Sequence, residues 1–147
     1  MVFPRDLPGI AERIRGTLPG LLGVEILALE DRTSRGRLAI RPDHLAPNGF
    51  LHAATVVGLA DTCCGLGCIT NLPEGGTGFT TIELKSNFIG TARDGLLVCE
   101  ARLTHGGRTT QVWDAEVKHE ESGKTIGLFR CTQMIFYAGE FDASRKD

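Results

Sequence analysis

The sequence predicts an α+β domain in which an antiparallel β-sheet wraps around one long central helix. First, residues 53–72 have the length of a helix and are apolar on nearly every side, which is typical of a buried helix. Second, four long β-like segments follow this helix, separated by glycine-containing turns. Third, only two shorter β-like segments precede it. A sheet around a single helix accommodates this order with the fewest assumptions.

Length and composition indicate one domain covering residues 1–147. The chain has 147 residues, of which 41% are hydrophobic and 23% charged, enough to form one buried core. We expect a short N-terminal helix at 8–18, a core at about 20–137 and a polar C-terminal tail at 138–147. The formal net charge of −2 argues against a general nucleic-acid-binding protein, which carries a basic face. No nucleic-acid partner is expected.

The N-terminal residues predict no targeting segment. Asp6 and two prolines stand where a signal peptide has an apolar run. The longest uncharged stretch, 44–60, contains Pro47 and Asn48 and is too polar to cross a membrane. We therefore expect a cytoplasmic protein without a membrane partner. The five cysteines show no metal-binding spacing, so free buried thiols and no metal site are expected.

The elements before the central helix follow from periodicity and turn residues. Ile10, Ile14 and Leu18 recur at helical spacing, and the following Pro-Gly pair is expected to end this helix. Residues 21–30 and 34–41 then predict two strands joined by a polar turn.

Three glycines lie inside the central helix, although glycine weakens a helix by about 1 kcal/mol relative to alanine. They are Gly58, Gly65 and Gly67, from a total of nineteen glycines. We expect that their small size lets the sheet approach the helix closely.

After the helix, the sequence predicts strands at 78–89, 96–104, 109–120 and 124–137. The dipeptides Asp94-Gly95, Gly106-Gly107 and Ser122-Gly123 separate them. Such dipeptides favour tight turns, so we expect hairpins and antiparallel pairing.

Asp61 is the one charged residue within the buried helix. No lysine or arginine occurs between residues 42 and 84. Removing an isolated carboxylate from water costs several kcal/mol and raises its pKa unless it is paired or hydrogen-bonded. The position is typical of a general base or nucleophile. A structural aspartate, satisfied by the loop before the helix, is the alternative.

His52 lies at the start of the same helix, nine residues before Asp61. That spacing puts the two side chains on opposite sides of the helix and about 13 Å apart along its axis. We therefore expect His52 to begin the helix rather than to act as a base. The first backbone N–H groups of the helix lack internal partners and can bind an oxyanion.

These residues resemble a known family, the hotdog-fold acyl-CoA thioesterases of the PaaI type, which are related to phenylacetate degradation. The family signature is an Asn-Pro-x-Gly loop, then His-Gly-Gly, then an acidic residue nine positions after the histidine. The corresponding residues here are HLAPNGFLHAA at 44–54, LADT at 59–62, TIELKSNF at 81–88, Gly95 and Gly107-Arg108. The resemblance covers residues 20–137 and implies a single hotdog domain.

The resemblance also implies catalytic roles. Asp61 would attack the thioester carbonyl or activate water to do so, and the Ala53 amide would polarise the thioester oxygen. Thr81, expected from the partner subunit, would orient the water or the carboxylate. His52 is the histidine of the signature. Asn48 is a candidate for contact with the thioester oxygen.

For substrate binding, the resemblance implies that Arg108, with Gly107, Lys85 and Asn87, contacts the phosphates or pantetheine of CoA. The CoA thioester is the substrate, and no cofactor is implied. A homodimer, and further a homotetramer, is expected.

Two departures from the signature bear on this interpretation. Ala53-Ala54 replaces Gly-Gly, and Ala46 stands where the family has asparagine, with Asn48 two residues later. Three alternatives stay open: a non-catalytic acyl-CoA-binding protein, a hotdog dehydratase or hydratase, and a nucleophilic cysteine at position 63 or 64. Phe50, Phe79 and Phe88 are candidates for an acyl pocket, or for simple core residues.

Overall fold

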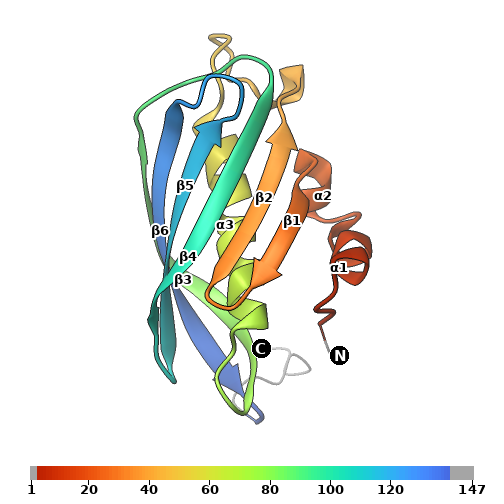
Figure 1. Cartoon of the computed structure of the whole chain (residues 1–147), viewed down its shortest axis with the longest axis vertical. Coiled ribbons are helices and arrows are strands. Elements are labelled where there is room, and N and C mark those ends of the chain that lie inside the picture. The colour runs from red at the N-terminus through yellow and green to blue at the C-terminus, as the bar shows by residue number, and fades with distance from the viewer. Residues whose placement is uncertain (1–2, 140–147) are drawn as a thin grey trace, which may run out of the picture.

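Six antiparallel strands form one sheet that curves around helix α3, as Figure 1 shows for the computed structural model. The structure describes residues 3–139, so residues 140–147 of the predicted tail lie outside it. The strand order across the sheet is β1-β2-β4-β5-β6-β3. The elements are α1 (Leu7–Ile14), α2 (Leu18–Leu22), β1 (Glu25–Glu30), β2 (Thr33–Ala39), η1 (Pro42–His44), α3 (Ala53–Thr70), β3 (Gly76–Phe88), β4 (Leu96–Gly106), β5 (Thr110–His119) and β6 (Thr125–Tyr137).

Helix α3 is apolar on most sides because it is enclosed. The sheet curves along its length, and α2 packs on it from another side. Ten of its eighteen residues are buried. By length and mean hydropathy, 1.5, it would also suffice to cross a membrane, but here it is the core helix of the fold.

Two of the three glycines in α3 meet the sheet, as expected. A Cβ atom at Gly65 would lie 2.9 Å from the Phe79 ring of β3, and one at Gly67 would lie 2.7 Å from the Trp113 ring of β5. The third, Gly58, faces the tip of Leu22 in α2 instead. Small residues in α3 therefore fix how closely two strands and one helix approach it.

The N-terminal prediction was wrong at its end. The single helix expected at 8–18 is two helices, α1 and α2, and the strand expected from residue 21 begins at Glu25. The expected stop, Pro19-Gly20, lies inside α2. Proline lacks an N–H, but the first turn of a helix does not need one, so Pro19 starts α2 rather than ending α1. Gly23, with φ of 78°, ends α2.

The predicted hairpin at Asp94-Gly95 was also wrong. β3 pairs with β6 at one edge of the sheet, whereas β4 pairs with β2 and β5. Residues 89–95 therefore cross from the edge to the middle of the sheet. Gly106-Gly107 and Ser122-Gly123 do join hairpins, β4–β5 and β5–β6. A turn dipeptide predicts a local reversal of the chain, but not which strand the next one joins.

A β-bulge interrupts the edge strand β3. Thr81 pairs with Gln133 and Glu83 with Thr132, so Ile82 is an extra residue without its own partner. The alternation of side chains therefore reverses across the bulge. Thr81 faces α3, whereas Lys85 and Asn87 lie on the outer face of the sheet.

Candidate active site

Asp61 lies near the middle of α3, on the wall of a largely apolar cavity of about 470 Å³. The cavity is bounded by α1, α3, the first half of β3 and single residues of α2 and β6, and its apolar wall includes Ile14, Leu66, Phe79 and Phe136. The Asp61 side chain is half-buried. A carboxylate thus borders a space that an apolar group of moderate size can fill.

Burial raises the pKa of Asp61 above its usual value. Among the described residues that line the cavity, Arg13 of α1 is the one other charged group. A carboxylate with a raised pKa is a stronger base than one in water, which suits it to accept a proton near neutral pH.

Thr81 belongs to the same chain as the Asp61 that it contacts, contrary to the expectation that it comes from a partner. Its Oγ1 lies 3.4 Å from Asp61 Oδ1 and 2.8 Å from Gln133 Oε1 on β6. The contact forms within one chain because β3 passes directly beside α3 at this point. A second copy is not needed to bring Thr81 to the carboxylate.

The predicted oxyanion donor, the Ala53 N–H, lies at the N-terminus of α3. His52 is the N-cap: its Nδ1 accepts a hydrogen bond of 2.9 Å from the Ala54 N–H, and its carbonyl accepts one from Thr55. His52 therefore begins the helix, as expected. The Ala53 N–H, by contrast, has no acceptor in the described part of the chain. It is an exposed donor at the positive end of the helix dipole.

Asn48 stabilises the loop that leads into α3. Its Oδ1 accepts a hydrogen bond of 3.1 Å from the Phe50 N–H, across Gly49 with φ of 83°. The buried His44 completes the loop, because its carbonyl accepts hydrogen bonds from the His52 N–H and the Thr55 hydroxyl. The side-chain oxygen of Asn48 thus accepts a hydrogen bond within the loop, whereas its NH₂ group has no acceptor among the described residues.

One chain does not bring the Ala53 N–H and the Asp61 carboxylate together. Ala53 and Asp61 are eight residues apart on a straight helix, which corresponds to about 12 Å along its axis. An oxyanion donor must lie about 3 Å from the oxygen of the same carbonyl group that the carboxylate or its water attacks. The amide of Ala53 and the carboxylate of Asp61 in one chain are therefore too far apart to act on one thioester.

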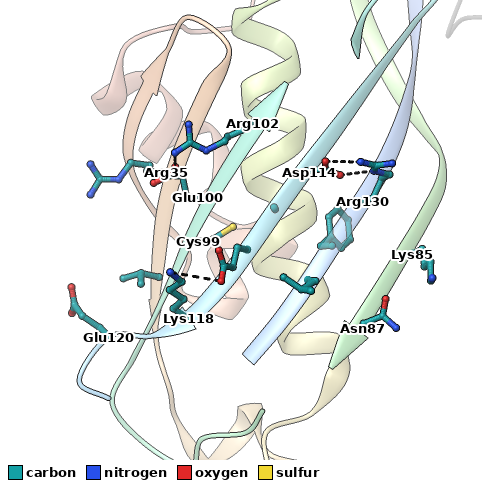
Figure 2. Close-up of a pocket in the computed structure, with 15 residues that line it drawn as sticks. Arg35, Lys85, Asn87, Cys99, Glu100, Arg102, Asp114, Lys118, Glu120 and Arg130 are labelled. Carbon is teal, nitrogen blue, oxygen red and sulfur yellow. Dashed lines mark hydrogen bonds and ion pairs between the residues drawn. The ribbon is translucent and has the colours of Figure 1, made fainter. Parts of the chain in front are cut away.

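The residues expected to bind CoA lie in two other places. Lys85 and Asn87 line a charged hollow of about 890 Å³ on the outer face of the sheet, on the side away from α3 (Figure 2). The same figure shows the two-bond ion pair of Asp114 with Arg130 on neighbouring strands. Arg108, with Gly107, lies in the β4–β5 turn, with its guanidinium 5.2 Å from the centre of the Tyr137 ring.

The cysteines are unsuited to nucleophilic chemistry. All five are free and buried. Burial raises the pKa of Cys64 well above its usual value and that of Cys68 to about 12. Since the thiolate is the reactive form, these two thiols are inert near neutral pH.

Sequence reasoning missed Gln133 and the contribution of α1. Gln133 is a fully buried amide next to Thr81. In the sequence, Gln133 stands out because it is polar, whereas Cys131 and Ile135, two positions before and after it on the same face of β6, are apolar and buried. The α1 wall carries no motif, because its role depends only on where the helix packs.

Comparisons with known proteins agree with this fold. The family model described as the thioesterase superfamily matches residues 48–126, more than half of the chain. A 1,4-dihydroxy-2-naphthoyl-CoA hydrolase from Listeria monocytogenes is 27% identical over 114 residues, which cover 78% of this chain and 91% of that protein. The acyl-coenzyme A thioesterase PaaI of Escherichia coli is 26% identical over 110 residues, 74% of this chain and 75% of that protein. The crystal structure of a thioesterase from Haemophilus influenzae has a TM-score of 0.85 and 25% identity, and the match covers 95% of this chain and 98% of that one.

Proposed function

Since the chain belongs to the thioesterase superfamily and has its hotdog fold, it is a thioester hydrolase, and we propose that Asp61 is the carboxylate with which it cleaves an acyl-CoA. The observation that carries this proposal is the position of Asp61. It is half-buried on the wall of an apolar cavity, and burial raises its pKa. An acyl group in the cavity brings its thioester carbonyl to this carboxylate.

Two chemical routes use this geometry. As a general base, Asp61 takes a proton from water, and the resulting hydroxide attacks the carbonyl carbon. As a nucleophile, it attacks the carbon itself, and water then hydrolyses the anhydride. In both routes the C–S bond breaks, CoA leaves as a thiolate that takes up a proton, and the acid is released. Negative charge builds on the carbonyl oxygen before the bond breaks, so an N–H donor there lowers the barrier.

The donor in this proposal is the Ala53 N–H of a second copy of the chain. Within one chain the Ala53 amide and Asp61 are about 12 Å apart along α3, too far to share a carbonyl. A homodimer in which two α3 helices run antiparallel puts the start of one helix near the middle of the other. The edge strand β3 supports such pairing, since Ile82 and Leu84 are 55% and 44% exposed on it.

The cavity favours a substrate with an aromatic or medium-length acyl group. Its volume of about 470 Å³ and its phenylalanine-rich wall fit such a group. Of the three phenylalanines singled out in the sequence, Phe79 lines the cavity. We propose that Arg108 binds the nucleotide of CoA, and that Lys85 and Asn87 contribute if dimers pair into tetramers through the outer face.

The first test is thiol release from aryl, short and medium acyl-CoA esters by wild type and Asp61→Asn. We expect at least a hundredfold lower kcat/KM in the variant, within the range of about 10²–10⁴ that acid-base groups contribute. Glu83→Gln, which removes an exposed carboxylate from the adjacent strand, serves as the matched control and should retain activity. Equal hydrolysis by Asp61→Asn would refute the assignment. Saturable binding without thiol release by wild type would identify a binding protein instead.

The second test removes the Ala53 N–H alone. Ala53 is the first residue of α3, where proline fits, and His52 has the extended backbone that proline requires before it. Ala53→Pro should therefore fold but lose turnover by about 10²–10³, the scale of one oxyanion donor, whereas Ala53→Gly keeps the donor and should stay active.

Mixing the two inactive variants tests which copies share a site. In a dimer with shared sites, a heterodimer of Asp61→Asn and Ala53→Pro has one site with both groups intact. Co-refolded mixtures should then recover about a quarter of the wild-type rate, because half of the dimers are mixed and each has one of two sites restored. No recovery in a mixture shown to contain heterodimers would place both groups in one chain.

A further inference from the structure

The buried amide of Gln133 competes with Asp61 for the single proton of the Thr81 hydroxyl. Thr81 Oγ1 is 2.8 Å from Gln133 Oε1, the usual length of an O–H···O bond, but 3.4 Å from Asp61 Oδ1. One hydroxyl proton makes one strong hydrogen bond. The shorter distance therefore assigns the proton to Gln133.

Packing alone does not require an amide at this position. Gln133 is fully buried, and the residues before and after it on the same face of β6, Cys131 and Ile135, are apolar. A buried amide costs free energy unless it is hydrogen-bonded. Besides the bond from Thr81, its Nε2 donates to Cys131 Sγ at 3.3 Å, which is a weak acceptor. The bond with Thr81 is thus the strong interaction that Gln133 makes as a side chain.

We propose that Gln133 is a positioning residue: it holds the Thr81 hydroxyl proton away from Asp61, so that the Asp61 carboxylate keeps its lone pairs for the proton of water. This inference rests on the proposed function, in which Asp61 is the reacting carboxylate. A hydrogen bond from Thr81 would stabilise the charged form and make it a weaker base. Gln133 prevents that without touching the substrate, since it does not line the cavity.

Replacing Gln133 by an apolar residue adds or removes no charge around Asp61. Arg13 of α1 lines the same cavity. Thiols face the interior from α3, β4 and β6, at Cys64, Cys99 and Cys131. Arg35 of β2, Lys85 of β3 and the acidic and basic residues of β5 lie on the outer face of the sheet, and α2 has no charged residue. A change in the pKa of Asp61 in such a variant therefore reports whether the Thr81 hydroxyl donates to Asp61.

The test is the pKa of Asp61 itself, measured by carbon NMR of the labelled aspartate carboxyl groups during a pH titration, with Asp61→Asn to assign the signal. In Gln133→Leu the freed hydroxyl turns to Asp61, and we expect the pKa to fall by about one unit, the scale of one hydrogen bond to a charged group. The pH at which kcat/KM falls on the acid side of its pH profile should decrease by the same amount. Gln133→Met, unbranched and of similar length, is the second variant in case leucine prevents folding.

Adding Thr81→Val to Gln133→Leu gives the matched control. Without the hydroxyl, the downward shift should disappear. A pKa that stays unchanged or rises in both Gln133 variants would overturn the proposal, because it would mean that Thr81 already donates to Asp61 in the wild type. The NMR titration needs no turnover, so it separates this failure from a failure of the thioesterase mechanism, which would show as full activity in Asp61→Asn.

Discussion

Replacing Gly67 by alanine tests whether contact with the sheet, rather than helix propensity, decides which residues α3 tolerates. The added Cβ would lie 2.7 Å from two carbon atoms of the Trp113 ring. Carbon atoms in contact prefer about 3.5–4.0 Å, so the ring or the helix must move by about 1 Å. Trp113 is fully buried, and its Nε1 donates a 2.8 Å hydrogen bond to Gln111 Oε1, which limits its movement.

The magnitude follows from two opposing effects. Overpacking a core costs about 1–3 kcal/mol. Alanine recovers about 1 kcal/mol of helix propensity relative to glycine. We therefore expect Gly67→Ala to lower the free energy of unfolding by about 1 kcal/mol, and by about 2 kcal/mol if the Trp113–Gln111 hydrogen bond is also lost.

Gly58→Ala is the matched control in the same helix. Its Cβ would meet only the Cδ1 tip of the half-buried Leu22, which can rotate away. The helix-propensity gain should then dominate, so Gly58→Ala is expected to be neutral or stabilising by up to about 1 kcal/mol.

Urea unfolding measures both variants. Far-UV circular dichroism and the fluorescence of Trp113, the one tryptophan of the chain, are followed at matched protein concentration, and the midpoints are compared at equal slope. If Gly67→Ala is as stable as wild type, or if Gly58→Ala loses as much as Gly67→Ala, the close approach of the sheet does not explain the glycines of α3.

Three further predictions concern charges and thiols. Asp61→Asn should raise the free energy of unfolding at neutral pH, because burial raises the pKa of Asp61 and its charged form opposes folding above that pKa. This gain in stability should shrink as the pH falls towards the unfolded-state pKa. A variant that is less stable than wild type at neutral pH would contradict this prediction. Asp114→Asn should have the opposite sign and cost at most about 1 kcal/mol, because Arg130 lowers the pKa of Asp114. That contribution is present above the unfolded-state pKa and lost as the pH falls through the lowered one, so thermal melts from acid to neutral pH should show the two variants diverging in opposite directions. The five buried cysteines should react with a thiol-specific disulfide reagent only after unfolding, with activity retained during native exposure; rapid native labelling with loss of turnover would reopen a role for a thiol.

The sequence predicted the central helix and its carboxylate because both leave a local signal. A helix that is apolar all round must be buried, and Asp61 is conspicuous within it. His52 was likewise identified correctly as the residue that begins the helix. These inferences depend only on spacing along one element.

What could not be predicted depends on how separate elements pack. The Thr81–Asp61 contact forms within one chain because β3 lies at the sheet edge beside α3. Pro19 was interpreted as a helix stop, although the same residue type also starts helices. Gln133 became visible only when the inward-facing positions of β6 were known.

The extra residue at Ile82 matters for comparing this chain with its relatives. A relative that lacks the extra residue must be aligned with a one-residue gap inside the strand, between Thr81 and Glu83. Without that gap, Lys85 and Asn87 are matched to positions that point at the helix, and their roles are transferred to the wrong side of the sheet. Ile82 thus separates the part of β3 in which Thr81 faces Asp61 from the part in which Lys85 and Asn87 lie on the outer face of the sheet.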